Sequence, residues 1–417
     1  MPLNRRRLIA VLLAMGWAVS GHPAGLNLPP LTGELSGNLN LLEWPGASPL
    51  AWRVTSVMQD GGTKLLLSTT APGLRLRIEA TLPVGEAPGT WRVIEGTADA
   101  AAWLPVTQAR VGPGALPADL TMSGDIRITG EGTWRGGELS GSMTSTLANG
   151  SARSTAQGWV AEEIAVTSEL SVNAGVATLS SAEVRVGSVQ AAGLVMRNLR
   201  IGLAGQERGR LQVQRAELDM LGGHVAFLPF AFDPAMPAVE TAAEFARIEL
   251  GELAPLVPQA LAEAHGQVNG RIGLRWSPAR GFEPGTGSLT VAPDTPATVR
   301  LAATPGFLTQ RMPRTIALLP AWLGPLARWF SPENPAYGTL QDIELGRQLL
   351  TVESLSLQLY PDGPDAPHSA RVELVASPAA GGVVKRVTFT VNVAGPLNQV
   401  LRLGFTDGVK VKAGAGP

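Results

Sequence analysis

The amino-acid sequence predicts an all-β protein built from antiparallel hairpins, and three observations carry this prediction. Apolar and polar residues alternate along many segments, as at 74–82, which places successive side chains on opposite faces of a strand. The 49 glycines and 33 prolines gather mostly in short clusters of the kind that tight turns require. The spacing between turns is commonly about 8 to 15 residues, as expected for strands without crossover helices, which disfavours a doubly wound α/β fold.

Residues 1–20 have the features of an export signal. The basic stretch 4–7 is followed by an uncharged apolar run at 8–19, and Ala18 and Ser20 are small residues where a signal peptidase would cleave. The run of about 12 residues is shorter than the roughly 20 that cross a bilayer as a helix. We therefore expect cleavage before Gly21 and a mature protein in the periplasm or cell envelope, with a short N-terminal anchor as the alternative.

Half-buried strands are expected along most of the remaining chain. At 74–82, Leu74, Leu76 and Ile78 alternate with charged residues, so one face is apolar and the other faces water. The pattern that begins at Leu211 changes phase before Ala216, which predicts a bulge or a bend. The same alternation recurs at Ile164, Val166, Leu170, Val172, Ile272, Leu274, Trp276, Val372, Leu374, Val387, Phe389, Val391 and Val393.

A loose repeat, G-x-Φ-x-G-x-Φ with Φ apolar, occurs at 33–39, 137–143 and, more distantly, 266–272. Glycines that flank one inward residue let a strand begin, kink and continue, which suits a wide sheet that twists. Such glycines are common in β proteins in general, so the repeat alone specifies no family.

Two stretches depart from the strand pattern. Leucine, alanine and proline at 252–264 predict one or two short helical turns that form a corner. The segment at about 315–330 has apolar residues at helical spacing, tryptophans and preceding arginines. It either docks on a membrane or protein partner, or packs as a helix that caps the sheet edge. The docking candidates are Arg311, Arg314, Ile316, Leu319, Trp322, Leu323, Leu326 and Trp329.

Composition and motifs argue against an enzyme and against nucleic acid as a partner. The 33 basic and 34 acidic residues leave a net charge of -1, and the absence of cysteine removes thiolate catalysis and thiolate metal sites. His224, His265 and His368 lie far apart without metal-ligand spacing, and the sequence has neither a nucleophile elbow nor a phosphate-binding loop. We expect no catalytic residue, no metal and no cofactor.

Several passages of the C-terminal half match one family in order. Residues 218–225 with 229–233 are similar to an "LLGG-x-V … PF-x-Φ-D" passage, and 264–274 to a "GxΦxGRΦxL" strand. Further similarities lie at 248–256, at 285–289, at 337–340, where the family enters its last strands, and at 393–397, where it closes with a "ΦxGPL" turn. Together these passages, over roughly 211–403, resemble the AsmA-like superfamily and its YdbH-like branch.

The resemblance implies an elongated, twisted antiparallel sheet curled into an apolar groove, with one or two short helices near the C-terminal module. It also implies non-enzymatic carriage of phospholipids, or other acyl lipids, between envelope membranes, with acyl chains inside the groove. Membrane surfaces and an envelope protein are the other implied partners. The residues expected to contact acyl chains are Ile272, Leu274, Trp276, Leu289, Val291, Leu355, Leu357, Leu359, Val372, Leu374, Val387, Phe389, Val391 and Val393.

We expect three regions: the signal peptide at 1–20, a β-groove region at 21–205 and a YdbH-like β module at 206–417. Alternation by itself fits a β-sandwich or a barrel as well as a groove, and only the resemblance selects the groove. The alternative is a scaffold or assembly factor for envelope proteins with a dry β-sandwich core. A hydrolase or lyase that acts on an envelope polysaccharide is a third hypothesis, with Glu131 and Glu138 facing each other across a hairpin.

Overall fold

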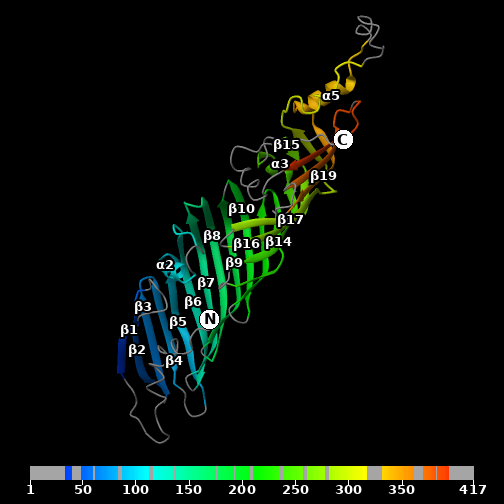
Figure 1. Cartoon of the computed structure of the whole chain (residues 1–417). Helices are drawn as coiled ribbons and strands as arrows, with labels where there is room; N and C mark the ends of the chain where they lie inside the picture. Colours follow the sequence, from blue (N-terminus) through cyan, green and yellow to red (C-terminus); the bar gives the residue numbers. More distant parts are fainter. Residues whose placement is uncertain are drawn as a thin grey trace. The chain divides into compact units, whose positions relative to one another are not determined.

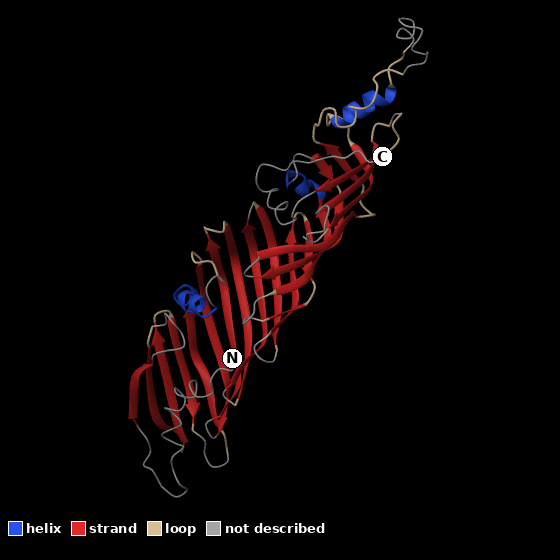
Figure 2. Ribbon diagram, viewed as in Figure 1, coloured by secondary structure: helices blue, strands red, loops and turns tan. Residues whose placement is uncertain are grey.

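The computed structural model describes residues 33–39, 48–59, 62–82, 87–111, 116–135, 138–174, 176–191, 193–206, 210–233, 238–256, 261–277, 281–316, 331–360, 370–381 and 383–393. These residues contain 21 strands, three short helices and one 3-10 turn, and the strands pair antiparallel (Figure 2). The predicted all-β class is confirmed. The predicted signal peptide lies outside the described residues.

The chain packs as two compact units. The N-terminal unit comprises Met1–Leu218 and Pro229–Val239, and the C-terminal unit comprises Asp219–Leu228 and Glu240–Pro417. These units are defined by packing, and the domain division predicted after residue 205 stays a prediction.

The N-terminal unit is a meander, because each of its first ten strands pairs with its neighbours in the chain (Figure 1). Helix α2 (Ala100–Val111) interrupts the meander between β5 and β6, and β11 (Leu211–Met220) pairs at its start with β13 (Phe230–Phe232). The ten strands are β1 Gly33–Leu39, β2 Leu50–Gln59, β3 Gly62–Ala71, β4 Leu74–Thr81, β5 Gly89–Asp99, β6 Thr121–Arg135, β7 Glu138–Ser154, β8 Trp159–Asn173, β9 Val176–Ala191 and β10 Leu194–Gly205.

The C-terminal unit is organised around β19. One edge of β19 pairs with β20, and the other pairs first with β18 and then with β17. Further pairs join β15 with β18, β16 with β17, β20 with β21, and β12 with β14. The elements are β12 Gly223–Phe227, β14 Val239–Glu249, α3 Leu250–Leu253, η2 Ala254–Leu256, β15 Leu261–His265, β16 Gln267–Ser277, β17 Gly281–Val291, β18 Ala297–Leu301, α5 Pro335–Glu344, β19 Leu350–Leu359, β20 Ala370–Pro378 and β21 Val387–Val393.

The glycine repeat has a packing explanation. In each copy the second glycine lies beneath a large side chain of the adjacent or next-but-one strand, in the pairs Gly37 with Trp52, Gly141 with Trp91, and Gly270 with Leu289. A Cβ atom added at Gly141 would lie 2.8 Å from Cζ2 of Trp91, closer than real Cβ atoms come to a neighbour. The repeat therefore marks the places where a side chain must be absent so that a larger one can lie flat on the sheet.

A line of irregular residues, here named the bulge line, crosses β6–β10. Asn149 in β7, Glu163 in β8 and Asn198 in β10 have φ angles of 53°, 56° and 54°, in the left-handed region that non-glycine residues seldom adopt. Gly187 of β9 lies between Glu163 and Asn198 in the strand register, and the β6–β7 register shifts at Gly124. Extra residues of this kind bend a strand and increase its twist.

The phase change predicted in β11 is confirmed by burial. Val213 and Ala216 are both buried, and the two residues between them, Gln214 and Arg215, are both exposed. A strict alternation would have buried one of the two, so β11 also presents two successive residues to water.

The helices differ in part from expectation. Of the corner predicted at 252–264, the described residues up to Leu256 are helical, whereas 261–265 form β15 and pair with β18. The segment predicted to be helical at about 315–330 lies outside the described residues except at its start, where Thr315 forms a bridge with Glu333.

Helix α5 occupies 335–344, so the passage at 337–340 that resembles the entry to the last strands is helical and precedes β19. The side chain of Asn334 accepts a hydrogen bond from the backbone N–H of Ala336 at 3.1 Å, and Pro335 opens the helix. Asparagine as the N-cap and proline in the first turn both favour a helix start.

Candidate functional site

The N-terminal unit presents one continuous apolar face, here named its inner face. Directly paired residues of adjacent antiparallel strands lie on the same face, so the register traces rows across the sheet. One row, across β1–β5, is Leu35, Val54, Leu67, Ile78 and Val93. Another, across β5–β10, is Ala98, Ile126, Leu147, Val166, Val184 and Ile201. Apolar side chains therefore follow one another across all ten strands.

This inner face is sealed in places, as at Leu67, Val93 and Leu147, and open in others. In β6 the inner residues, Ile126 and Ile128 among them, are half-buried, and none of the 15 residues of the strand is fully buried. The two facing sheets of a β-sandwich bury the equivalent residues against each other. The inner face of β6 consequently keeps apolar surface within reach of a ligand.

The opposite, outer face carries the charged residues. Ion pairs join neighbouring strands there at 3.1 Å between Arg53 and Glu34, 2.9 Å between Lys64 and Glu79, and 3.5 Å between Arg77 and Glu95. Exposed pairs contribute at most about 1 kcal/mol each. Their positions do establish which side of the sheet is in water.

The register of the C-terminal unit brings the predicted acyl-contact positions of five strands together on one face. One row is Leu289, Leu357, Val372 and Val391, the next is Leu355, Leu374 and Phe389, and a third is Ile272, Gly287, Leu359, Ala370 and Val393. Leu274 and Trp276 continue the alternation along β16, Val291 continues it along β17, and Val387 along β21. Contact of these residues with lipid stays a prediction.

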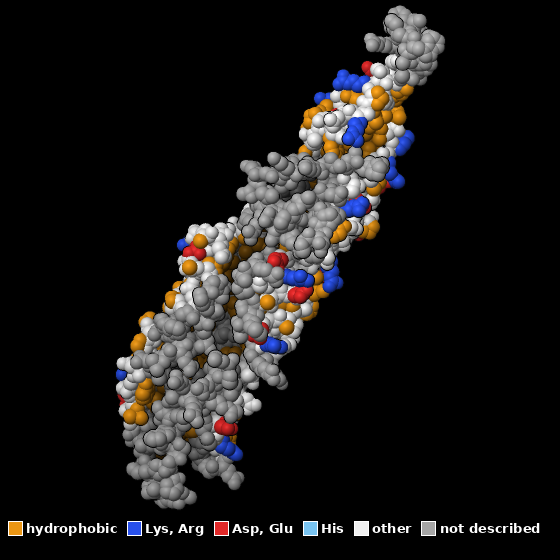
Figure 3. All heavy atoms as spheres, in the orientation of Figure 1, with side chains coloured by type: hydrophobic (Ala, Val, Ile, Leu, Met, Phe, Trp, Pro, Cys, Tyr) orange, Lys and Arg blue, Asp and Glu red, His pale blue; other side chains and the backbone are white. Residues whose placement is uncertain are grey.

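A cap covers part of this second face. Phe307 stacks on Phe389, with ring centroids 6.4 Å apart and planes inclined by 12°. Phe389, Leu374 and Val387 are buried, in contrast to half-buried Leu357. Figure 3 shows hydrophobic side chains at the surface of the described part of the molecule.

The loop that carries Phe307 is fixed by a buried carboxylate. Glu344, at the end of α5, accepts hydrogen bonds from the backbone N–H groups of Leu308 and Thr309 at 2.9 and 3.0 Å and from the Thr309 hydroxyl at 2.7 Å. Burial raises the pKa of Glu344, but these hydrogen bonds outweigh burial and lower the pKa below its usual value.

Three of the predicted docking residues are described. Arg311 and Ile316 are exposed, and Arg314 is bound to Tyr337, with Nε 3.0 Å from the phenolic oxygen and the guanidinium 5.4 Å from the ring centroid. This hydrogen bond lowers the pKa of Tyr337. The other docking candidates lie outside the described residues: Leu319, Trp322, Leu323, Leu326 and Trp329.

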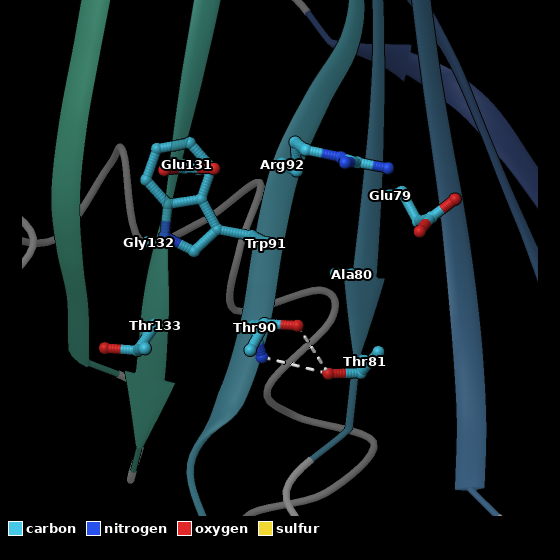
Figure 4. A pocket seen from close by; sticks show the side chains of 9 residues that line it. All are labelled: Glu79, Ala80, Thr81, Thr90, Trp91, Arg92, Glu131, Gly132 and Thr133. Atoms are coloured by element: carbon cyan, nitrogen blue, oxygen red, sulfur yellow. Dashed lines mark hydrogen bonds between the residues drawn. The ribbon is translucent and has the colours of Figure 1, made fainter.

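The strand register contradicts the carboxylate pair of the hydrolase hypothesis. Glu131 pairs with Ser142, and Glu138 pairs with Arg135, so the two carboxylates do not face each other. Figure 4 shows the open hollow beside Glu131, with Arg92 directed toward Glu79. Glu79 also binds Lys64, and Thr81 and Thr90 bind each other at 2.8 Å. Glu79, Thr81 and Thr90 of this lining are thus engaged with other surface groups.

Metal-ligating groups are scattered in the part of the chain that the structure describes. His224 lies beside Asp219 and His265 beside Glu263, each at 2.9 Å, and no described cluster has three such groups placed to hold a metal ion. Among the described helices, none has the length and apolar character to cross a membrane.

Comparison with protein families matches residues 24–310 to the YdbH-like family, whose description is "Intermembrane phospholipid transport protein YdbH". The match begins well before the passages at 211–403 that carried the resemblance, and it ends before the last of them. No curated protein and no solved structure matches the chain. Since the match covers more than half of the 417 residues, the chain belongs to the YdbH-like family.

Proposed function

We propose that this protein is a non-enzymatic carrier or bridge for phospholipids between envelope membranes, with acyl chains shielded against its apolar faces. The observation that carries the proposal is the half-buried inner face of β6, in a row of apolar residues that crosses the N-terminal unit. Large bare apolar surfaces are not tolerated in water, so such a face needs a ligand or a partner. A phospholipid, the cargo that the family description names, would cover this apolar face.

The energetics suit transport without chemistry. Each methylene group removed from water contributes about 0.8 kcal/mol, so an acyl chain on the inner face avoids most of the cost of crossing water. The charged residues of the outer face keep that side of the sheet in water. No covalent bond is made or broken, and no residue is assigned a catalytic role.

The location and docking follow from the same proposal. Residues 1–20 direct the chain to the periplasm, and Arg311, Arg314 and Ile316 belong to the surface that meets a membrane or an envelope protein. In the C-terminal unit the proposed acyl contacts are the residues expected from the sequence: Ile272, Leu274, Trp276, Leu289, Val291, Leu355, Leu357, Leu359, Val372, Leu374, Val387, Phe389, Val391 and Val393.

A scaffold with a dry core is the second candidate, and one observation favours it. In the C-terminal unit, Ile343, Leu350 and Ala376 have 0 % exposure, as in the core of a closed fold. The scaffold would be favoured over the carrier if the protein held no lipid and bound an envelope protein.

The decisive experiment is lipid extraction of the purified full chain followed by mass spectrometry. We expect bound phospholipid in the wild type and its loss in Ile128→Glu, which places a charge on the inner face. The matched control is Thr129→Glu, because Thr129 is the exposed neighbour on the outer face of the same strand. A folded, lipid-free wild type, or equal lipid loss in both variants, would contradict the carrier.

A further inference from the structure

Helix α2 and the turn after it cover one margin of the inner face of the N-terminal unit. Leu104 of the helix and Leu116 and Leu120 of the turn pack in one cluster with Met122, Ala152, Trp159 and Ile164. The last four occupy inner-face positions of β6, β7 and β8. Leucines of the chain itself thus occupy surface of the kind that the proposed function assigns to acyl chains.

One carboxylate fastens this cover, and we name it the latch. Asp119 accepts hydrogen bonds from the Ser154 hydroxyl at 2.7 Å, the Thr155 hydroxyl at 3.1 Å and the Ala156 N–H at 2.7 Å. These donors lie at the end of β7 and in the turn that follows it. The latch therefore joins the far end of the α2 segment to the β7–β8 hairpin.

The near end of α2 is tethered separately. The Ala101 N–H donates to Oδ1 of Asp99 at 2.9 Å, and Nε1 of Trp103 donates to the carbonyl oxygen of Gly73 at 3.3 Å. Pro105 interrupts the hydrogen bonding of the helix. If the latch opens, the segment stays attached at its first turn, which gives it a hinge.

A hollow lies beside the latch and shares residues with it. It is open to solvent, with a volume of about 520 Å³. Trp159, Ala191 and Leu194 come from the inner face, and Arg153, Val160, Gln190 and Val195 from the outer face, so the hollow lies on the rim where the two faces meet. Ser154 and Thr155, which bind Asp119, also line it.

We propose that this hollow is an entry port for phospholipid and that α2 is its gate. The inference rests on the proposed function, and it adds where the phospholipid enters and in which order it meets the residues of the protein. Arg153 meets the lipid phosphate at the lip, and the acyl chains pass Trp159 and Leu194. The chains then displace the leucines of the α2 segment and continue onto the inner face.

The port is tested by uptake of a fluorescent phospholipid from phosphatidylcholine vesicles by the full chain. Val195→Glu places a charge in the hollow and should slow the initial rate several-fold. The matched control is Val57→Glu, because Val57 is also an exposed valine, at 58 % against 45 %, on the outer face of β2. Equal rates for the two variants would overturn the port.

The gate is tested with Asp119→Cys combined with Ser154→Cys, in a chain that has no other cysteine. Uptake should fall several-fold below the wild type when the pair is oxidised and rise above it on reduction, with thiol titration to confirm the bond. Asp119→Asn alone should raise the rate of phospholipid uptake. This variant tests the gate if no disulfide forms in the double-cysteine variant. Wild-type rates in these variants would overturn the gate, whereas a wild type that takes up no phospholipid would sink the proposed function instead.

Discussion

At the scale of single residues, glycines decide where the largest inner-face side chains lie. The indole of Trp91 spans Gly132 and Gly141, and its Nε1 donates to the carbonyl oxygen of Ser140 at 3.2 Å. The two glycines have no side chain, so the indole of Trp91 provides the apolar surface of the inner face at their positions.

We expect Gly141→Val to lower the free energy of unfolding by about 1–3 kcal/mol, because the added atoms overlap the indole and the backbone of β6. Urea denaturation followed by tryptophan fluorescence measures this change. Ser142→Val, at the exposed neighbouring position, should change stability by less than about 0.5 kcal/mol. Similar losses in both variants would show that Trp91 does not need the glycine.

Asp119 makes stability depend on pH. The Ala156 N–H first, and then the Ser154 hydroxyl, lower its pKa from 3.8 to about 2. Because the pKa is lower in the folded state, this stabilisation is complete above the unfolded pKa and is lost as the pH falls from about 4 to about 2. The melting temperature should drop less over this range in Asp119→Asn than in the wild type, and parallel curves would contradict the assignment.

At the scale of elements, the loop at 302–312 has no regular structure and depends on one side chain of α5. Glu344→Leu should destabilise the C-terminal unit by about 3 kcal/mol, because it leaves the donors of Leu308 and Thr309 unsatisfied. Glu344→Gln should cost less, since the amide oxygen still accepts. Deuterium exchange at 304–310 measures the effect.

Exposed Glu252→Leu on α3 is the control for that substitution. Unchanged amide protection of Leu308 and Thr309 in Glu344→Leu would show that the loop is held by the contact between Phe307 and Phe389 instead.

Strands were the elements that could be predicted best, because the alternation of apolar and polar residues is visible within each short segment of the sequence. Two helices were missed for different physical reasons. α2 contains Pro105 and has little amphipathic character, so its only local signal is Asp99, whose side chain binds the Ala101 N–H. α5 has a stronger local signal in Asn334, whose side chain caps the helix, and in Pro335 of its first turn.

At the scale of the whole molecule, within the described ranges each of β2 to β9 in the N-terminal unit pairs only with strands next to it in the chain. Local opening therefore has no distant partner to break. In Gly141→Val, we expect faster deuterium exchange in β6–β8 and little change in β2 and β3. A uniform increase over the unit would indicate that the meander opens as one body.

The sequence also predicted which residues share a face, but not which parts of a face are covered. Alternation placed Phe389 and Leu357 on the same side of the sheet, and the register agrees. That Phe389 is buried depends on Phe307, which comes from a loop distant in the sequence. Whether a side chain on a face is covered depends on tertiary contacts, and the sequence near β21 does not indicate the contact with Phe307.

The bulge line has a consequence for how such a chain can change in length. Its irregular positions stand in register, from Gly124 through Asn149 and Glu163 to Asn198, so a residue inserted into one strand beside them would shift that strand against both neighbours. Residues added in pairs at a hairpin tip avoid this shift, because both strands of the hairpin lengthen together. Length variation among related chains is therefore expected at the turns, while the spacing between the bulge line and the inner-face rows stays constant.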